Sequence, residues 1–207
     1  GELKVKGYEN GFGYMVECPD VQKIGLHDVL IFSPQGIEPN GDEFHNKFNS
    51  VYLIGDLDLE TLTFTPDGPM QELDRGFDFY APQCASQSVY SDCSIMSAWF
   101  GVPDYTYLPT DEEGWSGLQT FVRELTIRKG KLYQTPVRGF ESLKKDELFC
   151  AKNGEIISDK LHGQMPSSAI IRIENPDAES LDLNLFSRNY VIARGFAISY
   201  EKYTKRL

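Results

Sequence analysis

The amino-acid sequence predicts an all-β fold, and two observations carry that prediction. Apolar and aromatic residues occur in short alternating runs, which is the spacing of half-buried strands, and Gly, Pro, Asn and Asp separate the runs. Only one stretch, Phe140–Leu148, places apolar residues at helical spacing. The chain has 207 residues, of which 41% are hydrophobic, so it can fill the core of one ordinary domain or of two small ones.

Eight short strands are expected before the helix. They are 12–16, 29–33, 51–55, 62–64, 77–81, 94–100, 121–127 and 131–137. Arg128-Lys129-Gly130 joins the last two and is a short hairpin signal. After the helix, strands are expected at 169–173, 181–186 and 190–200. Eight strands fit either two four-stranded blades of a β-propeller or one β-sandwich, and periodicity alone does not choose between them.

The charge balance narrows the classes of partner. The formal net charge is −11, which argues against a nucleic-acid or anionic-membrane surface because the field of the protein would repel phosphates. A small basic pocket remains compatible with this charge. One positive side chain, Arg123, lies on the more apolar face of its strand, so we expect a buried partner for its guanidinium.

Metal, cofactor and membrane signals are missing from the sequence. No apolar run approaches the roughly 20 residues of a membrane helix. The sequence begins Gly-Glu-Leu-Lys, and we expect no signal peptide. The four cysteines contain no CxxC pair and the three histidines share no ligand spacing, so we expect no metal site. No phosphate-binding glycine loop is present, and we expect no cofactor. Cys84 and Cys93 could face each other across a hairpin, although we expect reduced thiols and a cytoplasmic location.

Glu17 is the first candidate for chemistry. It follows the aromatic, apolar strand Phe12–Val16 and precedes Cys18 and Pro19. A carboxyl at the exit of such a strand is expected to be partly desolvated, which favours its neutral form and raises its pKa, as a general acid needs. The alternative is a solvated glutamate at the end of a strand.

A second group of candidates suits a sugar pocket. Asp78 and Tyr80 alternate with Phe77 and Phe79, so a polar pair is expected on one side of the strand and two phenyl rings on the other. Trp99 could supply a stacking face for a sugar ring. The alternatives are an Asp that binds loop amides, a Tyr at the edge of the core, and a core Trp.

Four strings, taken in order, resemble glycoside hydrolase family 32. They are Gly13-Tyr-Met-Val-Glu-Cys-Pro-Asp20, Phe32-Ser-Pro-Gln-Gly36, Leu73-Asp-Arg-Gly-Phe-Asp-Phe-Tyr-Ala-Pro-Gln83, and Gly114-Trp-Ser-Gly followed by Arg123-Glu-Leu-Thr-Ile-Arg-Lys-Gly-Lys-Leu-Tyr-Gln-Thr-Pro-Val137. The resemblance is dense from residue 7 to about 145 and weaker beyond. It implies a five-bladed β-propeller followed by a β-sandwich, and hydrolysis of β-fructofuranosides such as sucrose or sucrose-6-phosphate with retention of configuration.

The resemblance also implies residue roles. Glu17 matches the general acid/base, which protonates the departing sugar's oxygen and then deprotonates the attacking water. Cys18 matches the neighbour that borders the acid/base, Asp78 and Tyr80 match a segment that lines the pocket, and Trp99 matches a tryptophan of the following strand. These four are the expected substrate-binding residues.

Two motifs of the family do not occur in these 207 residues. The family's nucleophile belongs to an Asn-Asp-Pro-Asn-Gly motif and a second, stabilising aspartate to an Arg-Asp-Pro motif, and neither string is present. We therefore expect the last blades of a propeller at 1–137, a linker helix at 138–149 and the start of a sandwich at 150–207. The chain alone is expected to be inactive and to associate, either with the missing half of the propeller or with itself, since open sheet edges favour strand pairing.

Other functions stay open at this stage. The chain could be a non-catalytic module that binds a fructoside through Tyr80 and Trp99, or a purely structural remnant. Whether the substrate is phosphorylated also stays open: Lys23, Lys47 and Arg75 are available, but nothing in the sequence shows that they converge on one phosphate.

Overall fold

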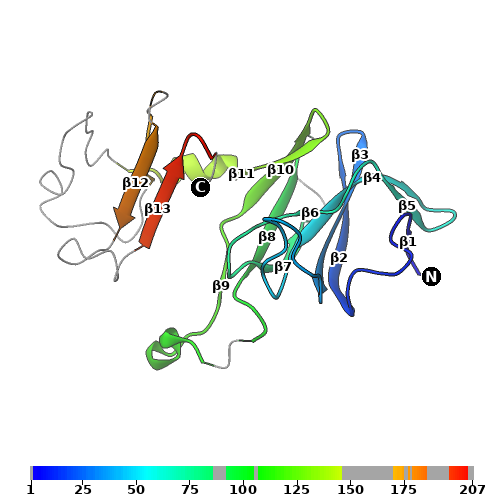
Figure 1. Ribbon diagram of the computed structural model, residues 1–207, viewed down its shortest axis with the longest axis horizontal. Helices are drawn as coiled ribbons and strands as arrows, with labels where there is room; N and C mark the ends of the chain where they lie inside the picture. Colours follow the sequence, from blue (N-terminus) through cyan, green and yellow to red (C-terminus); the bar gives the residue numbers. More distant parts are fainter. Residues whose placement is uncertain are drawn as a thin grey trace, which may run out of the picture. The chain divides into compact units, whose positions relative to one another are not determined.

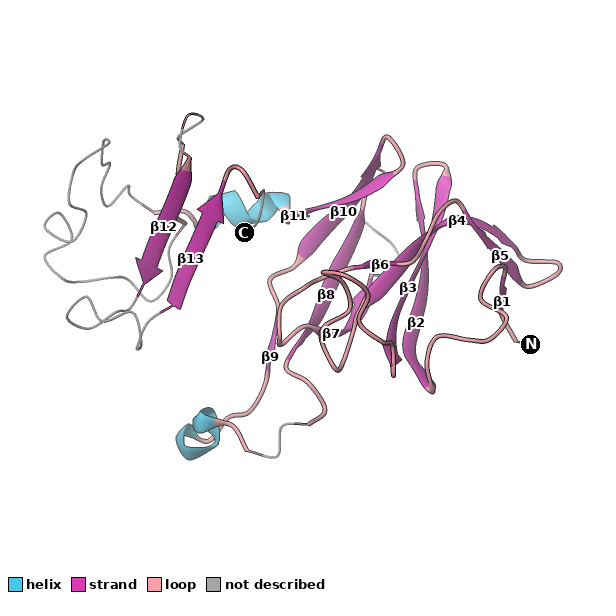
Figure 2. Cartoon of the chain, viewed as in Figure 1, coloured by secondary structure: helices cyan, strands magenta, loops and turns pink. Residues whose placement is uncertain are grey.

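The computed structural model describes residues 2–85, 92–104, 107–145, 170–174, 177, 179–185 and 196–204. The chain divides into two compact units, Gly1–Lys144 and Lys145–Leu207, which are described separately. The elements of the described residues are strands, together with the short 3₁₀ helices η1 (Pro109–Glu113) and η2 (Arg138–Leu143) (Figures 1 and 2). The prediction of an all-β chain is confirmed for the described residues.

The first sheet is an antiparallel meander with a short strand added at its outer edge. Its order is β1-β5-β4-β3-β2, and β6 also pairs with β4. The strands are β1 (Lys4–Val5), β2 (Met15–Ile24), β3 (His27–Gln35), β4 (Val51–Asp58), β5 (Thr63–Pro66) and β6 (Gln71–Glu72). The pairs from β2 to β5 are antiparallel, whereas β1 runs parallel to β5. The strands β2 to β5 therefore have the topology of a four-stranded propeller blade.

The second sheet repeats this arrangement. Its order is β11-β10-β8-β7, with β9 paired to β8, and its described pairs are antiparallel. The strands are β7 (Tyr80–Cys84), β8 (Ser94–Phe100), β9 (Leu118–Gln119), β10 (Arg123–Arg128) and β11 (Lys131–Pro136). Lys129 and Gly130 both have positive φ between β10 and β11, which is the backbone of the tight hairpin that the sequence predicts.

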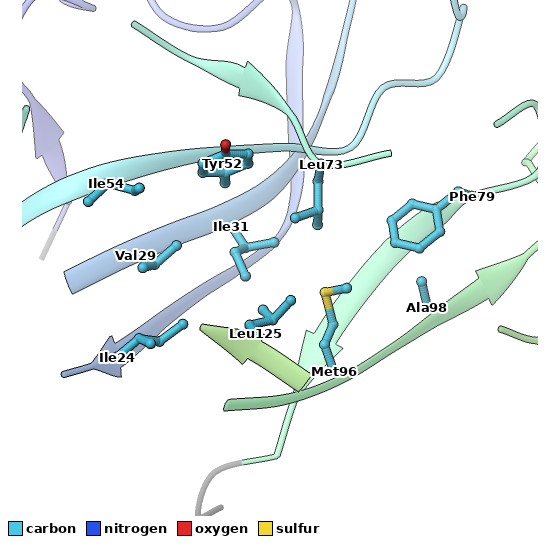
Figure 3. Close-up of a cluster of buried hydrophobic side chains, with 10 residues drawn as sticks. All are labelled: Ile24, Val29, Ile31, Tyr52, Ile54, Leu73, Phe79, Met96, Ala98 and Leu125. Carbon is cyan, nitrogen blue, oxygen red and sulfur yellow. The ribbon is translucent and has the colours of Figure 1, made fainter. Parts of the chain in front are cut away.

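The two sheets share a hydrophobic core (Figure 3). It contains Ile24, Val29, Ile31, Tyr52, Ile54, Leu73, Phe79, Met96, Ala98 and Leu125, which come from both sheets. Leu30 and Phe32, the alternate residues of β3, enter a second core with Phe64. Because β3 is buried on both faces, its sequence is a continuous apolar run rather than an alternating one.

The packing between the sheets can be tested by removing one methyl group from the core. We expect Ile31→Val to lower the free energy of unfolding of the 207-residue chain by about 0.5–1.5 kcal/mol, because Ile31 is fully buried between the sheets. The same substitution at Ile170, which is 57% exposed, is the matched control and should change it by less than about 0.5 kcal/mol. Urea denaturation measures both, and equal losses would show that this core is loosely packed.

Two of the expected strands are displaced by turns. The strand expected at 12–16 begins only at Met15, because Gly11 and Gly13 on either side of Phe12 have left-handed φ values that interrupt an extended backbone. The strand expected at 77–81 begins at Tyr80, because Asp74 Oδ1 accepts a hydrogen bond from the Gly76 N–H (2.7 Å) and forms a turn there.

The second unit is described only in part. The strands β12 (Ser180–Leu185) and β13 (Phe196–Glu201) pair antiparallel, close to the expected positions, while 186 and 190–195 lie outside the described residues. The prediction of a strand at 169–173 is wrong at 170–173, which are exposed and have no strand partner among the described residues, while 169 lies outside those residues. The helix expected at Phe140–Leu148 is the 3₁₀ helix η2, and 146–150 lie outside the described residues. The division into 1–137, 138–149 and 150–207 stays a prediction.

Candidate active site

Glu17 lies inside β2 rather than at the exit of a strand. The strand continues through Cys18 and Pro19 to Ile24, with a register shift between Glu17 and Asp20. Cys18 takes a left-handed φ of 49° at this bulge. A bulge breaks the regular alternation of side chains and redirects them, and it also tolerates a proline, which cannot donate to a ladder. The expected strand exit is therefore corrected to a bulge that aims the carboxylate of Glu17.

The carboxylate of Glu17 accepts two hydrogen bonds on one oxygen. The Tyr80 hydroxyl donates to Oε2 at 2.6 Å, and Gln35 Nε2 donates to the same atom at 2.8 Å. Gln35 Nε2 also lies 3.1 Å from the Tyr80 hydroxyl, so the three polar groups form one network. Glu17 is half-buried by these partners, whereas Met15 and Val16 of its own strand are exposed. The partners of the carboxylate thus come from β3 and β7, and not from the apolar run that precedes Glu17.

Tyr80 is suited to act as a permanent donor. It is buried, and desolvation together with the neighbouring Glu17 carboxylate holds the pKa of its phenol well above the usual range. The phenol therefore keeps its proton and donates a hydrogen bond to Glu17. The ring packs edge-on against Phe48, with 5.5 Å between the ring centroids, which fixes the direction of the hydroxyl.

Asp20 connects the bulge to the second sheet. Its Oδ2 accepts a hydrogen bond from the backbone N–H of Cys84 at 2.7 Å, and Gln83 Nε2 donates one to the carbonyl of Cys18 at 3.2 Å. Both bonds join β2 to β7, which lie side by side where the sheets meet (Figure 1). Neither role was foreseen from the sequence, although Asp20 belongs to the string Glu-Cys-Pro-Asp that drew attention to Glu17.

The other residues that the sequence predicts for the site are Cys18, Asp78 and Trp99, which adjoin Glu17 or Tyr80 in the chain or in the sheet. Cys18 is exposed beside Glu17 in the chain. Trp99 pairs in register with Tyr80 and is 38% exposed as a residue, so it is not a core tryptophan. Asp78 lies in the turn before β7, and its Oδ1 is buried without a hydrogen-bond partner. The hydrogen bonds described for Glu17 come from Tyr80 and Gln35, and not from Asp78 or Trp99.

The expected alternation of polar and phenyl groups at this segment is wrong. Phe77 is 83% exposed, whereas Phe79 and Tyr80 are both buried. The reason is the turn at Asp74 and Gly76, which delays the start of the strand to Tyr80. Phe79 instead points into the core shared by the sheets (Figure 3).

Arg123 has the partner that its position predicts. Its Nη1 donates to Asp74 Oδ2 at 2.7 Å and to Gln134 Oε1 at 2.8 Å, and its guanidinium lies 4.6 Å from the centre of the Phe79 ring. Both charged side chains are at least three-quarters buried. The pair of Arg123 and Asp74 anchors the turn that leads into Tyr80. The Arg-Glu-Leu string is thereby linked to the site.

The candidate phosphate ligands are paired with carboxylates. Lys23 contacts Asp28 at 3.1 Å, Lys47 forms an ion pair with Asp104, and Arg75 lies 2.8 Å from Glu72. The described residues contain no group of three or more His, Cys, Asp or Glu side chains that could hold a metal ion. The Cys84 thiol is free, so no disulfide joins Cys84 to Cys93, and burial raises the pKa of Cys84 above its usual range. Among the residues that the structure describes, no helix has the length and apolar character needed to cross a lipid bilayer.

The two adjacent sheets have the topology of neighbouring β-propeller blades, and they meet at a hydrogen-bonded glutamate that is suited to acid–base chemistry. The sequence profile of the "Glycosyl hydrolases family 32 N-terminal domain" matches residues 2–136. The chain belongs to glycosyl hydrolase family 32, as the four strings predict.

Sequence relatives and solved structures agree with this assignment. The sucrose-6-phosphate hydrolase of Staphylococcus xylosus is 42% identical over 66% of this chain and 27% of its own length. That of Bacillus subtilis is 35% identical over 90% of this chain and 37% of its own length. A family 32 β-fructofuranosidase of Bombyx mori, solved as a mutant in complex with sucrose, has a TM-score of 0.60 and 38% identity over 70% of this chain and 30% of its own. The chain thus spans about a third or less of the length of most relatives that it matches.

Proposed function

We propose that this chain carries the acid/base part of the active site of a retaining β-fructofuranosidase that hydrolyses sucrose or sucrose-6-phosphate. One observation carries the proposal: Glu17 Oε2 accepts hydrogen bonds from Tyr80 and Gln35 at the junction of two propeller sheets. A carboxyl held on one oxygen leaves its other oxygen available for proton transfer. The names of the relatives, sucrose-6-phosphate hydrolase and β-fructofuranosidase, support the substrate class.

Glu17 would act twice in each turnover. As an acid, it donates its proton to the bridging oxygen while the bond from that oxygen to the fructosyl carbon breaks, so the departing sugar leaves as a neutral alcohol. A second carboxylate attacks the fructosyl carbon from the opposite side and forms a covalent intermediate. As a base, Glu17 then removes a proton from the water that displaces this carboxylate, which regenerates the acid form. Cys18, Asp78, Tyr80 and Trp99 are proposed to border the bound sugar.

The second carboxylate is proposed to come from outside these 207 residues. A retaining pair needs two carboxyl groups about 5–5.5 Å apart. The hydrogen-bonded neighbours described for Glu17 are a phenol and an amide, and the Asn-Asp-Pro-Asn-Gly string does not occur in this sequence. Met15 and Val16, each exposed by more than two-fifths on the strand at the end of the first sheet, are proposed to pack against a further propeller blade. We use "complete enzyme" for these residues together with those that complete the propeller, in one polypeptide or in a partner chain.

The 207-residue chain purified alone is therefore expected to hydrolyse no sucrose. The measurement is the release of glucose from sucrose, with the complete enzyme as the positive control. Turnover by the chain alone that disappears in Glu17→Gln would show that the second carboxylate lies within these residues. Binding of sucrose by the complete enzyme without turnover would favour the non-catalytic binding module.

Substrate phosphorylation and location belong to the same proposal. The ratio of kcat/KM for sucrose-6-phosphate to that for sucrose measures the phosphate preference. Because Lys47 and Arg75 are paired with carboxylates, neither is expected to supply a strong phosphate contact by itself. The free thiols of Cys18 and Cys84 support a reducing compartment, and we propose the cytoplasm.

A further inference from the structure

The hydrogen bonds around Glu17 extend one residue further than its direct partners. Gln35, at the end of β3, donates through Nε2 to Glu17 and accepts through Oε1 from the Tyr14 hydroxyl at 2.8 Å. Tyr14 immediately precedes β2, and its backbone N–H donates to the carbonyl of Gln35 at 2.9 Å. The two residues are thus joined twice, once through their main chains and once through their side chains.

Two glycines make room for this contact. A Cβ at Gly13 would lie 2.0 Å from the Gln35 carbonyl oxygen, and a Cβ at Gly36 would lie 2.5 Å from the Tyr14 ring. Both glycines have φ values near +80°, which other residues adopt at a cost. The close approach of Gly13-Tyr14 to Gln35-Gly36 therefore depends on glycine on both sides. It brings a largely exposed tyrosine into contact with an amide that faces the site.

Glu17 sets which end of the Gln35 amide faces the site, and the Tyr14 hydroxyl anchors the other end. A carboxamide can turn by 180°, which would exchange its oxygen and its NH₂ group. In the reversed orientation, the amide oxygen of Gln35 would face the carboxylate oxygen of Glu17, and NH₂ would face the Tyr14 hydroxyl. The first contact is repulsive, whereas the Tyr14 hydroxyl can donate to an oxygen or accept from an NH₂ group. The Glu17 carboxylate therefore selects the orientation in which Gln35 donates to it, and the hydrogen bond from Tyr14 to Oε1 holds the amide in place.

We propose that Tyr14 and Gln35 are positioning residues that hold Glu17 Oε2, so that Oε1 is the atom that exchanges the proton with the sugar and with water. The proposal rests on the proposed function of Glu17 as the acid/base. Oε2 accepts from both Tyr80 and Gln35, so its lone pairs are already engaged. A proton placed on Oε2 would displace one of these donors, whereas a proton on Oε1 leaves both bonds intact. The network thus chooses the reactive oxygen and holds the carboxyl group in one orientation.

The test uses two variants of the complete enzyme and two substrates. Gln35→Met removes the amide at similar length, and Tyr14→Phe removes only the hydroxyl while the ring stays against Gly36. For sucrose, whose leaving group needs a proton, kcat/KM should fall about 10-fold to 100-fold in Gln35→Met and about 3-fold to 10-fold in Tyr14→Phe. For a nitrophenyl β-fructofuranoside, whose leaving group departs without protonation, the formation of the intermediate should change less than 2-fold in either variant. A role that is merely structural would lower both rates together.

Controls separate this proposal from the proposed function. Tyr133→Phe removes a hydroxyl from an exposed tyrosine of β11 and should leave both rates unchanged. In a Glu17→Gln background, Tyr14→Phe should have no further effect, because the two residues act on the same proton transfer. If Glu17→Gln lowers sucrose hydrolysis but both positioning variants leave it unchanged, Tyr14 and Gln35 have no such role. If Glu17→Gln itself has no effect, the proposed function fails.

Discussion

Glu17→Gln is expected to lower kcat/KM of the complete enzyme for sucrose by about 10²-fold to 10⁴-fold. The amide has the size of the carboxyl group, and its oxygen can accept the hydrogen bonds from Tyr80 and Gln35 in place of Oε2. Its NH₂ group then occupies the position of Oε1 and can neither protonate a leaving group nor accept a proton from water. The loss should therefore appear in the rate and not in the free energy of unfolding.

The choice of substrate and nucleophile identifies the step that is lost. With the nitrophenyl fructoside, the intermediate should still form in Glu17→Gln, but its hydrolysis should be slow because water has lost its general base. Azide needs no deprotonation, so it should accelerate turnover of that substrate in the variant and not in the unmodified enzyme. Glu60→Gln, in the exposed turn between β4 and β5, is the matched control and should retain full activity. Full sucrose turnover by Glu17→Gln would exclude Glu17 as the acid/base.

The sequence predicts those parts of the fold whose signals are local. The strand expected at Ser94–Phe100 has the bounds of β8, and the positive φ values of Lys129 and Gly130 confirm the hairpin expected at Arg128-Lys129-Gly130. Where turns intervene, alternation misleads. Phe77 belongs to an apparently regular run but is 83% exposed, because the hydrogen bond from the Gly76 N–H to Asp74 outweighs strand periodicity at that point.

The site is predictable residue by residue but not as a network. Resemblance to family 32 points to Glu17 and Tyr80, and the structure joins them at 2.6 Å. Gln35 belongs to one of the four strings, but nothing in that string gives it a role. Its side chain nevertheless hydrogen-bonds to both Glu17 and Tyr80. Glu17, Gln35 and Tyr80 lie 18, 45 and 63 positions apart in pairs, and no local pattern reports a contact that depends on the pairing of β2 with β3 and on the packing of β7 from the other sheet. The bulge at Cys18 escapes prediction for a related reason, since it breaks the periodicity on which strand assignment rests.

Gly13→Ala is expected to impair both stability and activity. The left-handed φ of 81° at this position costs an alanine roughly 1–2 kcal/mol, and a Cβ only 2.0 Å from the Gln35 carbonyl oxygen forces a backbone shift that costs about 1–3 kcal/mol more. Urea denaturation of the 207-residue chain should show a loss of about 2–5 kcal/mol. The shift moves Gln35 away from Glu17, so kcat/KM of the complete enzyme for sucrose should fall at least about 10-fold, the equivalent of one lost hydrogen bond to a charged group.

Gly11→Ala separates the clash from the backbone conformation. Gly11 has a φ of 82°, nearly the same as Gly13, but a Cβ at Gly11 would have the Gly13 carbonyl oxygen as its nearest neighbour, at 3.9 Å. The left-handed cost of roughly 1–2 kcal/mol should therefore appear without the clash, and sucrose hydrolysis should be nearly unchanged. Equal losses of activity in the two variants would mean that the contact between Gly13 and Gln35 does not position the acid/base. A loss confined to Gly13→Ala would show that the start of β2 holds the end of β3, and with it the proton-transferring carboxyl group, in place.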